Sequence, residues 1–210
     1  MKHLPAHLAK DCTEPPPFIP DSAAEERLTR YTELLARWSV RINLVSHADR
    51  LEERHIRDSL QLVPLLPPSG AVADLGSGGG LPGLVIGIAQ PDREVHLIES
   101  DKRKAAFLLD AAARLGLTQV KVHAVRIESA TLPNLAAVTA RALAPLSVLL
   151  AHAHRLMPQG GIALFPKGRT AEQELTAALP HWHMTVERFR SRTDPLSTIF
   201  RISEIHSAAE

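Results

Sequence analysis

The sequence predicts an α/β fold, with a mainly parallel, seven-stranded sheet that helices cover on both faces and that a helical appendage precedes. Two observations support this prediction. From Ala71 onward, short apolar runs alternate with amphipathic stretches of helical period, as in a parallel sheet covered on both faces. The first apolar run leads into a glycine-rich turn, the feature that follows the first strand of a Rossmann-like sheet.

Composition excludes several classes of protein. The 210 residues have a net charge of +1, with 45% hydrophobic and 22% charged residues, which is ordinary for a globular protein. The overall charge does not indicate a nucleic-acid binder, although it is compatible with a local basic patch. Cys12 is the single cysteine, so no internal disulfide is expected. We find no apolar run of about 18 residues and no signal-peptide pattern, and expect a cytoplasmic protein without a membrane span.

We expect three segments. Residues 1–20 are rich in proline and are predicted to form an irregular arm. Residues 21–70 are predicted to form the helical appendage, and residues 71–210 the α/β domain. The boundary is placed at the prolines and glycine between positions 64 and 70, because these residues end helices.

The appendage begins with a predicted amphipathic helix. Ser22-x-x-Glu25 is a capping box, which marks a helix start. Arg30, Arg37 and Arg41 lie beside the apolar face of this helix, where they either follow RNA phosphates or cover the edge of that face with their stems. The second interpretation is favoured. The apolar face itself consists of Leu28, Tyr31, Leu34, Leu35, Trp38 and Ile42.

A second helix is predicted from Asp49 to about Val63. Arg54 and Asp58 are four residues apart and share a face of it, as do their neighbours His55 and Ser59. Taken alone, this pattern is typical of an exposed helix with local ion pairs.

The α/β domain should follow in regular alternation. A helix is expected to stop at Gly116, and the last two β segments have no helix between them, which indicates an antiparallel pair at the sheet edge. The expected strands are about 71–75, 94–99, 119–125, 136–140 and 161–165, then 182–190 and 197–205; the expected helices end at about 89 or span about 101–115, 145–156 and 170–179.

The segment Asp74–Gly83 reads Asp-Leu-Gly-Ser-Gly-Gly-Gly-Leu-Pro-Gly and is predicted to turn from the first strand into a helix. Its glycines permit positive φ angles and a close approach of ligand to backbone. Gly78-x-Gly80-x-x-Gly83 matches a dinucleotide pattern, but a carboxylate at Asp74 would repel a pyrophosphate. The same carboxylate would attract S-adenosylmethionine, which has an ammonium and a sulfonium and no phosphate. We therefore favour S-adenosylmethionine as the ligand.

Further candidates stand where the later strands are predicted to end. Glu99 can accept hydrogen bonds from the two hydroxyls of a ribose. Ile127 and Glu128 follow the third strand, from which an adenine edge is reached, and Arg141 directly follows the fourth, facing the cleft. Lys167 follows the fifth strand, and its surroundings lack the pattern of a phosphate-binding P-loop.

The absence of several sequence motifs limits the reactions that are expected of this protein. The histidine pairs His152/His154 and His181/His183 lack further ligands, so no metal is expected. No cysteine is available for attack on cytosine, and no Asn/Asp-Pro-Pro-aromatic turn follows the fourth strand, as methylation of an exocyclic amine would require. Guanine N7 already has a lone pair and needs only positioning, so the sequence permits this target without requiring it.

At this point the chain resembles a known family over about residues 27–205. The motifs, in their order and approximate spacing, are Asn43-Leu44, Arg54-His55-Ile56-x-Asp58-Ser59-Leu60, the Asp74–Gly83 loop, Arg126-Ile127-Glu128, Arg141-Ala142 and Lys167-Gly168. Their arrangement is similar to that of the RsmG (GidB) family, the bacterial small-subunit ribosomal RNA guanine-N7 methyltransferases. Departures are Leu143, where members commonly have a larger aromatic residue, and Glu99, which is often Asp.

The resemblance implies a class I methyltransferase fold and transfer of a methyl group from S-adenosylmethionine to N7 of one guanosine in 16S rRNA. The implied substrate is the rRNA or the small ribosomal subunit, and we expect a monomer. No catalytic residue is identified, and Arg141 is a candidate. The cofactor contacts are expected from Asp74, Gly76, Gly78, Leu81, Glu99, Ile127, Glu128 and Arg141; Asn43, Arg54, His55, Asp58 and Lys167 are assigned to substrate binding or architecture.

Two alternatives from other functional classes stay open at this stage. The Gly78-x-Gly80-x-x-Gly83 pattern is compatible with an NAD(P)-dependent oxidoreductase. The same loop is also compatible with a non-catalytic module that binds nucleotide or RNA.

Overall fold

The structure is a computed structural model that describes residues 12–44 and 55–209. In chain order its elements are α1 (Ser22–Ser39), α2 (Arg57–Leu60), the 3₁₀ helix η4 (Val63–Leu65), β1 (Ala71–Leu75), α3 (Gly83–Ala89), β2 (Val95–Ile98), α4 (Lys102–Leu115), β3 (Val120–His123), the 3₁₀ helix η5 (Ile127–Ser129), β4 (Leu135–Thr139), α5 (Leu146–Leu156), β5 (Ile162–Lys167), α6 (Ala171–Ala178), β6 (Trp182–Arg190) and β7 (Thr198–Ser207).

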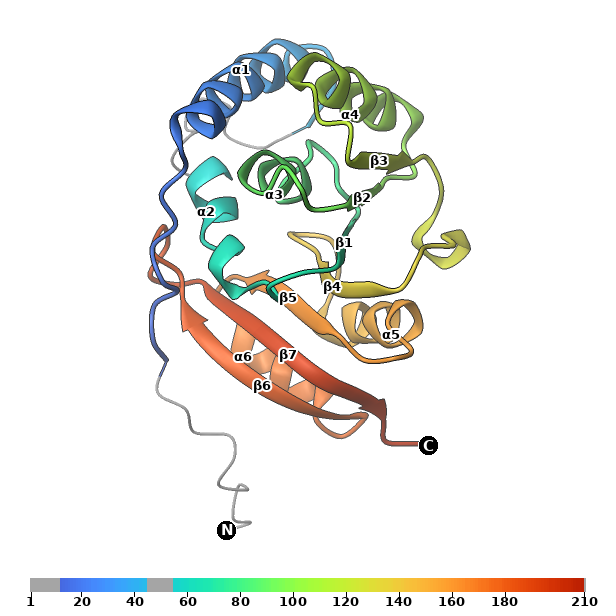
Figure 1. The fold of residues 1–210 in the computed structure, drawn as a ribbon. Coiled ribbons are helices and arrows are strands. Elements are labelled where there is room, and N and C mark those ends of the chain that lie inside the picture. The colour runs from blue at the N-terminus through green and yellow to red at the C-terminus, as the bar shows by residue number, and fades with distance from the viewer. Residues whose placement is uncertain (1–11, 45–54, 210) are drawn as a thin grey trace.

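The strands form one seven-stranded sheet in the order β3-β2-β1-β4-β5-β7-β6 (Figure 1). Strands β1 to β5 pair in parallel, whereas β7 is antiparallel to both β5 and β6. The predicted parallel sheet with an antiparallel pair at its edge is thus confirmed. A loop of residues 191–197 joins β6 to β7, as expected from the lack of a helical pattern there.

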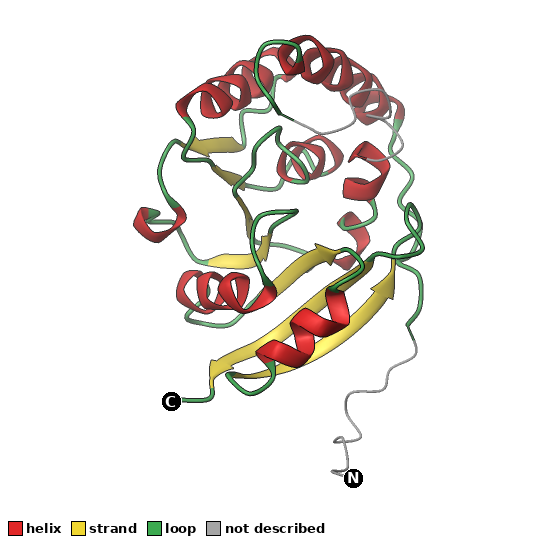
Figure 2. Ribbon diagram, turned by 180° about the vertical axis from the view of Figure 1, so that it is seen from behind, coloured by secondary structure: helices red, strands yellow, loops and turns green. Residues whose placement is uncertain are grey.

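Helices cover both faces of this sheet because its central strands are apolar on both sides. Strand β1 is buried along its whole length, and its side chains alternate between two clusters: Val72 joins one, and Ala73 and Leu75 join the other. The first cluster includes side chains of α1, α3 and α4, and the second includes those of α5 and α6. Figure 2, seen from behind, shows α6 lying across the long strands at the antiparallel edge.

Helix α1 has the predicted apolar face, and Tyr31 and Leu35 are fully buried on it. The predicted capping box is wrong by one residue. Asp21, rather than Ser22, is the N-cap, and its side chain accepts a hydrogen bond of 2.7 Å from the N–H of Ala24. Both residue types are good N-caps, so the sequence rule does not separate adjacent positions.

The second predicted helix is confirmed only in part, because its regular helical structure ends at Leu60 and not at about Val63. Residues 49–54 lie outside the described residues, and the remainder is not one helix but the short α2 followed by the separate turn η4. Pro64 lies within η4 and has no N–H to donate to a preceding carbonyl, which explains why a regular helix does not continue there.

The described part of the arm lies against the antiparallel edge of the sheet. Thr13 forms an isolated parallel bridge with Phe189 of β6, and its carbonyl accepts a hydrogen bond of 2.9 Å from the N–H of Arg190. Within the described ranges, no helix has both the length and the apolar character needed to cross a bilayer.

Candidate active site

The glycine-rich loop lies where the strand order reverses. Strands β2 and β3 extend to one side of β1, and β4 and β5 extend to the other. Ligands of open α/β sheets bind at the carboxyl ends of the strands at this switch point. The order therefore places the loop after β1 between Glu99, which follows β2, and Arg141, which follows β4.

Asp74 lies beneath the loop rather than at its surface, since its side chain is fully buried. Its Oδ2 accepts a hydrogen bond of 3.1 Å from the N–H of Gly83, at the start of α3. Its Oδ1 is buried and has no hydrogen-bond partner among the described residues. Burial raises the pKa of Asp74 to about 7, against the opposing effects of the Gly83 hydrogen bond and of the charge of Arg141.

Glu99 contacts the same loop from the neighbouring strand. Its Oε2 accepts a hydrogen bond of 2.9 Å from the N–H of Gly78, and its Oε1 accepts one of 2.8 Å from the N–H of Asp101. A carboxylate has about four acceptor sites, so two donors leave acceptor capacity for a ligand. Glu99 therefore fixes the loop and can still accept ligand hydroxyls.

Two glycines of the Asp74–Gly83 loop have positive φ angles, which residues other than glycine rarely adopt. Gly78 has φ +54°, and a Cβ added there would come no closer than 3.8 Å to the Gly76 carbonyl oxygen, so the space beside it is open. Gly76 has φ +64°, and a Cβ there would lie 2.5 Å from the Leu143 side chain. Leu143 therefore packs directly on the loop, at the position that departs from the family pattern.

Tyr31 is a site residue that sequence reasoning missed, because it was assigned only to the apolar face of α1. Its hydroxyl donates a hydrogen bond of 2.5 Å to the carbonyl of Gly79, 48 residues away. Burial raises the pKa of Tyr31 well above its usual value, so the hydroxyl stays protonated as a donor. The signal that could have found it is general: a buried tyrosine hydroxyl needs a hydrogen-bond partner.

Arg141 joins the loop side of the site to α2. Its Nη1 lies 2.9 Å from Nδ1 of His55 and 3.4 Å from Oδ2 of Asp58. His55 is buried, and Arg141 and Asp58 are only 18% and 16% exposed. The structure thus brings together three of the predicted residues from two distant parts of the chain.

Arg141 and Asp58 border a cavity of about 430 Å³. Sites for small molecules are typically about 300–1,000 Å³, so the cavity suits a nucleobase with part of its sugar. Its wall comes from α2, the segment after β4, the end of β5 and the loop between β6 and β7, and includes Asp58, Arg141, Leu143, Lys167, Ser191 and Ser197.

Lys167 is at the last position of β5, two residues beyond the predicted strand end. Its ammonium group lies 2.8 Å from Oε2 of Glu174 and donates a hydrogen bond of 2.6 Å to the carbonyl of Ala144. Glu174 also accepts a hydrogen bond of 2.8 Å from the N–H of Leu146. Lys167 therefore braces the segment after β4, which supports the architectural alternative for this residue.

The remaining predicted residues are not gathered as tightly. Ile127 and Glu128 lie in η5 beyond β3, where Glu128 is exposed, and Leu81 is buried with the apolar cluster beneath α3. Asn43 is exposed after α1, and no described contact ties it to the cleft. Arg54 lies outside the described residues. Cofactor or substrate contacts of these residues stay predictions.

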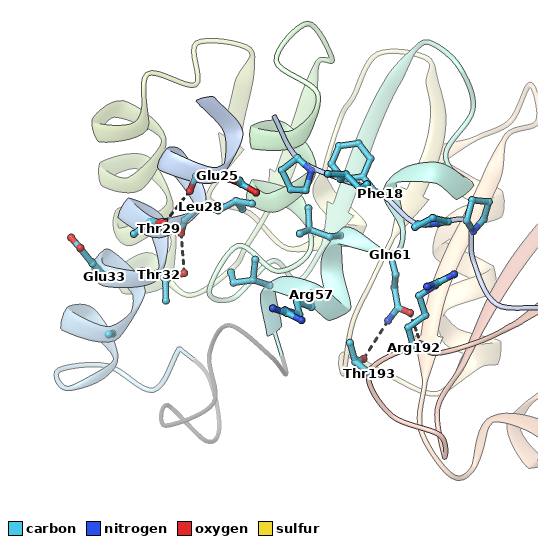
Figure 3. A pocket seen from close by; sticks show the side chains of 17 residues that line it. Phe18, Glu25, Leu28, Thr29, Thr32, Glu33, Arg57, Gln61, Arg192 and Thr193 are labelled. Atoms are coloured by element: carbon cyan, nitrogen blue, oxygen red, sulfur yellow. Dashed lines mark hydrogen bonds between the residues drawn. The ribbon is translucent and has the colours of Figure 1, made fainter. Parts of the chain in front are cut away.

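A larger cavity of about 880 Å³ lies between the arm, α1 and α2, and none of the residues of the glycine-rich loop Asp74–Gly83 lines it (Figure 3). Its lining includes Phe18, Leu28, Arg57, Gln61, Arg192 and Thr193. Asp58 lines the smaller cavity and Gln61, one turn later, lines the larger one, so α2 separates the two.

The residues present fit a cationic adenosine ligand. Two carboxylates, Asp74 and Glu99, adjoin the glycine loop, one buried oxygen of Asp74 has no described partner, and the space beside Gly78 is open. They do not suit a pyrophosphate, because the carboxylates already take the N–H groups of Gly78 and Gly83. Among the described residues, no group of three or more His, Cys, Asp or Glu side chains is placed to hold a metal.

Fold and site together define a class I S-adenosylmethionine-dependent methyltransferase. Solved structures agree on the fold: M. jannaschii TYW2 in complex with AdoMet has a TM-score of 0.57 at 10% identity, covering 80% of this chain and 80% of that one. A solved structure from Methanococcus maripaludis, named a putative S-adenosyl-L-methionine-dependent methyltransferase, has a TM-score of 0.59 at 9% identity, covering 81% of this chain and 90% of that one.

The chain belongs to the GidB family, rRNA small subunit methyltransferase G, whose model matches residues 24–193. A ribosomal RNA small subunit methyltransferase G from Granulibacter bethesdensis is 55% identical over 86% of this chain and 85% of its own length. The protein of that name from Acidiphilium cryptum is 53% identical over 87% of this chain and 86% of its own length. The resemblance to this family is confirmed, and the oxidoreductase and non-catalytic alternatives are wrong.

Proposed function

We propose that this protein transfers a methyl group from S-adenosylmethionine to N7 of a guanosine in 16S rRNA, acting on the rRNA or on the small ribosomal subunit. The family membership and the names of the relatives support the rRNA substrate. The protein acts as a monomer in the cytoplasm under this proposal, where ribosomal subunits are assembled.

The observation on which the proposal depends is the pair of carboxylates at the glycine loop. S-adenosylmethionine supplies an electrophilic methyl group on a sulfonium centre. Glu99 keeps acceptor capacity for the ribose hydroxyls of the adenosine, and ionised Asp74 favours a cationic ligand from beneath the loop. Under this proposal, Arg141 contacts the remainder of the cofactor or the incoming base, which its position on the opposite side of β1 and at the cavity wall supports.

The cavity beside Arg141 is the proposed position of the guanine. N7 presents a lone pair, so no side chain has to remove a proton before the methyl group is transferred. Holding N7 in line with the methyl group and the sulfur can contribute roughly 7–11 kcal/mol of barrier reduction. The bracing of the segment after β4 by Lys167 and Glu174 supports such a positioning role.

The test is to incubate the protein with labelled S-adenosylmethionine and rRNA or small subunits from a strain without this gene, and to map the label by mass spectrometry. One 7-methylguanosine in 16S rRNA is expected. Glu99→Gln should lower kcat/KM by about tenfold or more, since the amide has one acceptor oxygen for two backbone donors. Glu33→Gln, at an exposed position of α1, is the control. Label on another base atom, or on protein, would refute the proposal.

A further inference from the structure

A polar cluster behind Asp58 is not used by the proposed reaction. It consists of Gln61 from the end of α2 and of Ser191 and Thr193 from the loop between β6 and β7. Gln61 and Ser191 are each only 5% exposed. A buried cluster of polar side chains is costly unless its members bond to one another, so its hydrogen bonds indicate what it holds in place.

The cluster holds one oxygen of Asp58. Oδ1 of Asp58 accepts hydrogen bonds of 2.8 Å from Nε2 of Gln61 and 2.9 Å from the hydroxyl of Thr193. The other oxygen, Oδ2, is the one that lies 3.4 Å from Nη1 of Arg141. The two oxygens therefore face different partners, and the donors on Oδ1 set the rotation of the carboxylate.

The orientation of the Gln61 amide is itself fixed. Its Oε1 accepts a hydrogen bond of 3.0 Å from the backbone N–H of Arg192, which can only donate. Its Nε2 must then face Asp58, and it also lies 3.1 Å from the hydroxyl of Ser191. Figure 3 shows Gln61 and Thr193 pointing toward each other across the gap between α2 and the loop.

We propose that Gln61 and Thr193 are positioning residues for Arg141, acting through Asp58, so that the loop between β6 and β7 controls the guanidinium at the methyl-transfer site. This inference rests on the proposed function, in which Arg141 contacts cofactor or guanine. If the donors on Oδ1 are removed, the Asp58 carboxylate is free to rotate, and Arg141 loses the fixed position of one of its partners, while the contact with His55 stays.

The test compares Thr193→Val, which keeps the shape of the side chain and removes the hydroxyl, with Thr193→Ser, which keeps the hydroxyl. Thr176→Val is the matched control, because the Thr176 hydroxyl donates to a carbonyl within α6, away from the site. Four quantities are measured for each variant: the melting temperature, the Kd of S-adenosylhomocysteine by calorimetry, and kcat and KM for rRNA.

We expect Thr193→Val to weaken S-adenosylhomocysteine binding by about tenfold and to lower kcat/KM similarly, because a hydrogen bond to a charged group is lost. Thr193→Ser should stay within about twofold of the parent. In an Asp58→Ala background, Thr193→Val should have little further effect, since the coupling passes through Asp58. If Thr193→Val lowers kcat/KM but leaves the Kd unchanged, the positioning role is also supported, and Arg141 then faces the guanine and not the cofactor.

A purely structural role predicts a different result. If Thr193→Val lowers the melting temperature but changes neither the Kd nor kcat/KM more than Thr176→Val does, the inference is wrong. Should Thr193→Val not fold, Thr193→Ala removes the same hydroxyl without a methyl group facing the polar cluster. Parent protein that binds S-adenosylhomocysteine but leaves rRNA unmethylated would refute the proposed function, whereas the Kd comparison would still test the positioning of Arg141.

Discussion

Near neutral pH, the folded protein contains both ionised and protonated Asp74, because burial raises the pKa of this carboxyl to about 7. A cation bound at the loop favours the ionised form. Binding of S-adenosylmethionine should therefore release a proton in this pH range, and the apparent Kd depends on the fraction of Asp74 that is already ionised.

The first prediction follows from that linkage. Raising the pH from 6 to 8 should tighten S-adenosylmethionine binding by up to about tenfold, because the ionised fraction rises through a pKa of about 7. In Asp74→Asn this dependence should disappear. Isothermal titration at several pH values measures it, and an equal pH dependence in parent and variant would contradict the role of Asp74.

The second prediction concerns stability. The folded pKa of Asp74 lies above the unfolded value of about 3.9, so the folded state binds the extra proton between about pH 4 and 7. The contribution of this group to stability is therefore most favourable at low pH and declines as pH rises through 7. Asp74→Asn should raise the melting temperature relative to the parent more at pH 8 than at pH 5. Asp92→Asn, at an exposed carboxyl, is the control and should show no such difference.

At the scale of elements, the segment between β4 and α5 depends on contacts from β5 and α6. Burial acts to raise the pKa of Glu174, but hydrogen bonds from Lys167 and Thr170 bring it below its usual value, so Glu174 is ionised at neutral pH. Its hydrogen bond from the N–H of Leu146 then fixes the start of α5, and Lys167 fixes the carbonyl of Ala144.

The third prediction tests this brace. Lys167→Met leaves the Glu174 carboxylate without its cation and should destabilise the fold by about 1–3 kcal/mol, because the pair is largely buried. Denaturant unfolding measures the loss. The double variant Lys167→Met/Glu174→Gln should recover part of it, and additive losses in the double variant would show that the two side chains do not act as a pair.

The elements themselves could be predicted where a strong period marks them. Strand β1 was expected at its observed position, and the helix over about 101–115 ends as expected at Gly116, whose φ of +68° is the left-handed conformation of a C-cap. The helix predicted from Asp49 ends earlier than about Val63, which the sequence does not show, because Pro64 marks a boundary but does not reveal that it lies within a separate 3₁₀ turn.

The site could be predicted only in part, because some of its contacts join residues that are far apart in the sequence. Residues that follow strand ends, such as Glu99 and Arg141, can be placed because parallel strands end at one edge. The bond between Gln61 and Ser191 joins positions 130 apart, and nothing near either residue indicates it. The burial of Asp74 was likewise invisible, since a carboxylate after an apolar strand looks the same whether it faces solvent or lies under a loop.

For the molecule as a whole, the three arginines predicted to lie beside the apolar face of the first helix divide into two kinds, with Arg41 just beyond the end of α1. Arg30 donates a hydrogen bond of 2.7 Å to the carbonyl of Arg114, so it joins α1 to α4. Arg37 and Arg41 are exposed and border a cavity of about 430 Å³ beside Trp38. The contact of Arg30 supports the interpretation that these arginines cover the edge of the apolar face. Arg37 and Arg41 are exposed and available to rRNA.

The fourth prediction separates those interpretations. Arg37→Glu/Arg41→Glu should raise KM for rRNA, and removing each phosphate contact should reduce the slope of log affinity against log salt by about one. The Kd of S-adenosylhomocysteine should not change. Arg103→Glu/Arg190→Glu makes the same change in net charge at two exposed positions on other elements and serves as control. Equal effects of the two double variants would indicate a general charge effect and no specific contact.

The bridge between Thr13 and β6 has a consequence for self-association. An outermost strand with unsatisfied amides is a template on which further copies can add, and growth of that kind leads to fibres. Thr13 takes the amide of Arg190, and Pro15, Pro16 and Pro17 follow with no N–H of their own to offer. The three prolines thus offer no N–H to a second chain at three successive positions, which opposes extension of the ladder there.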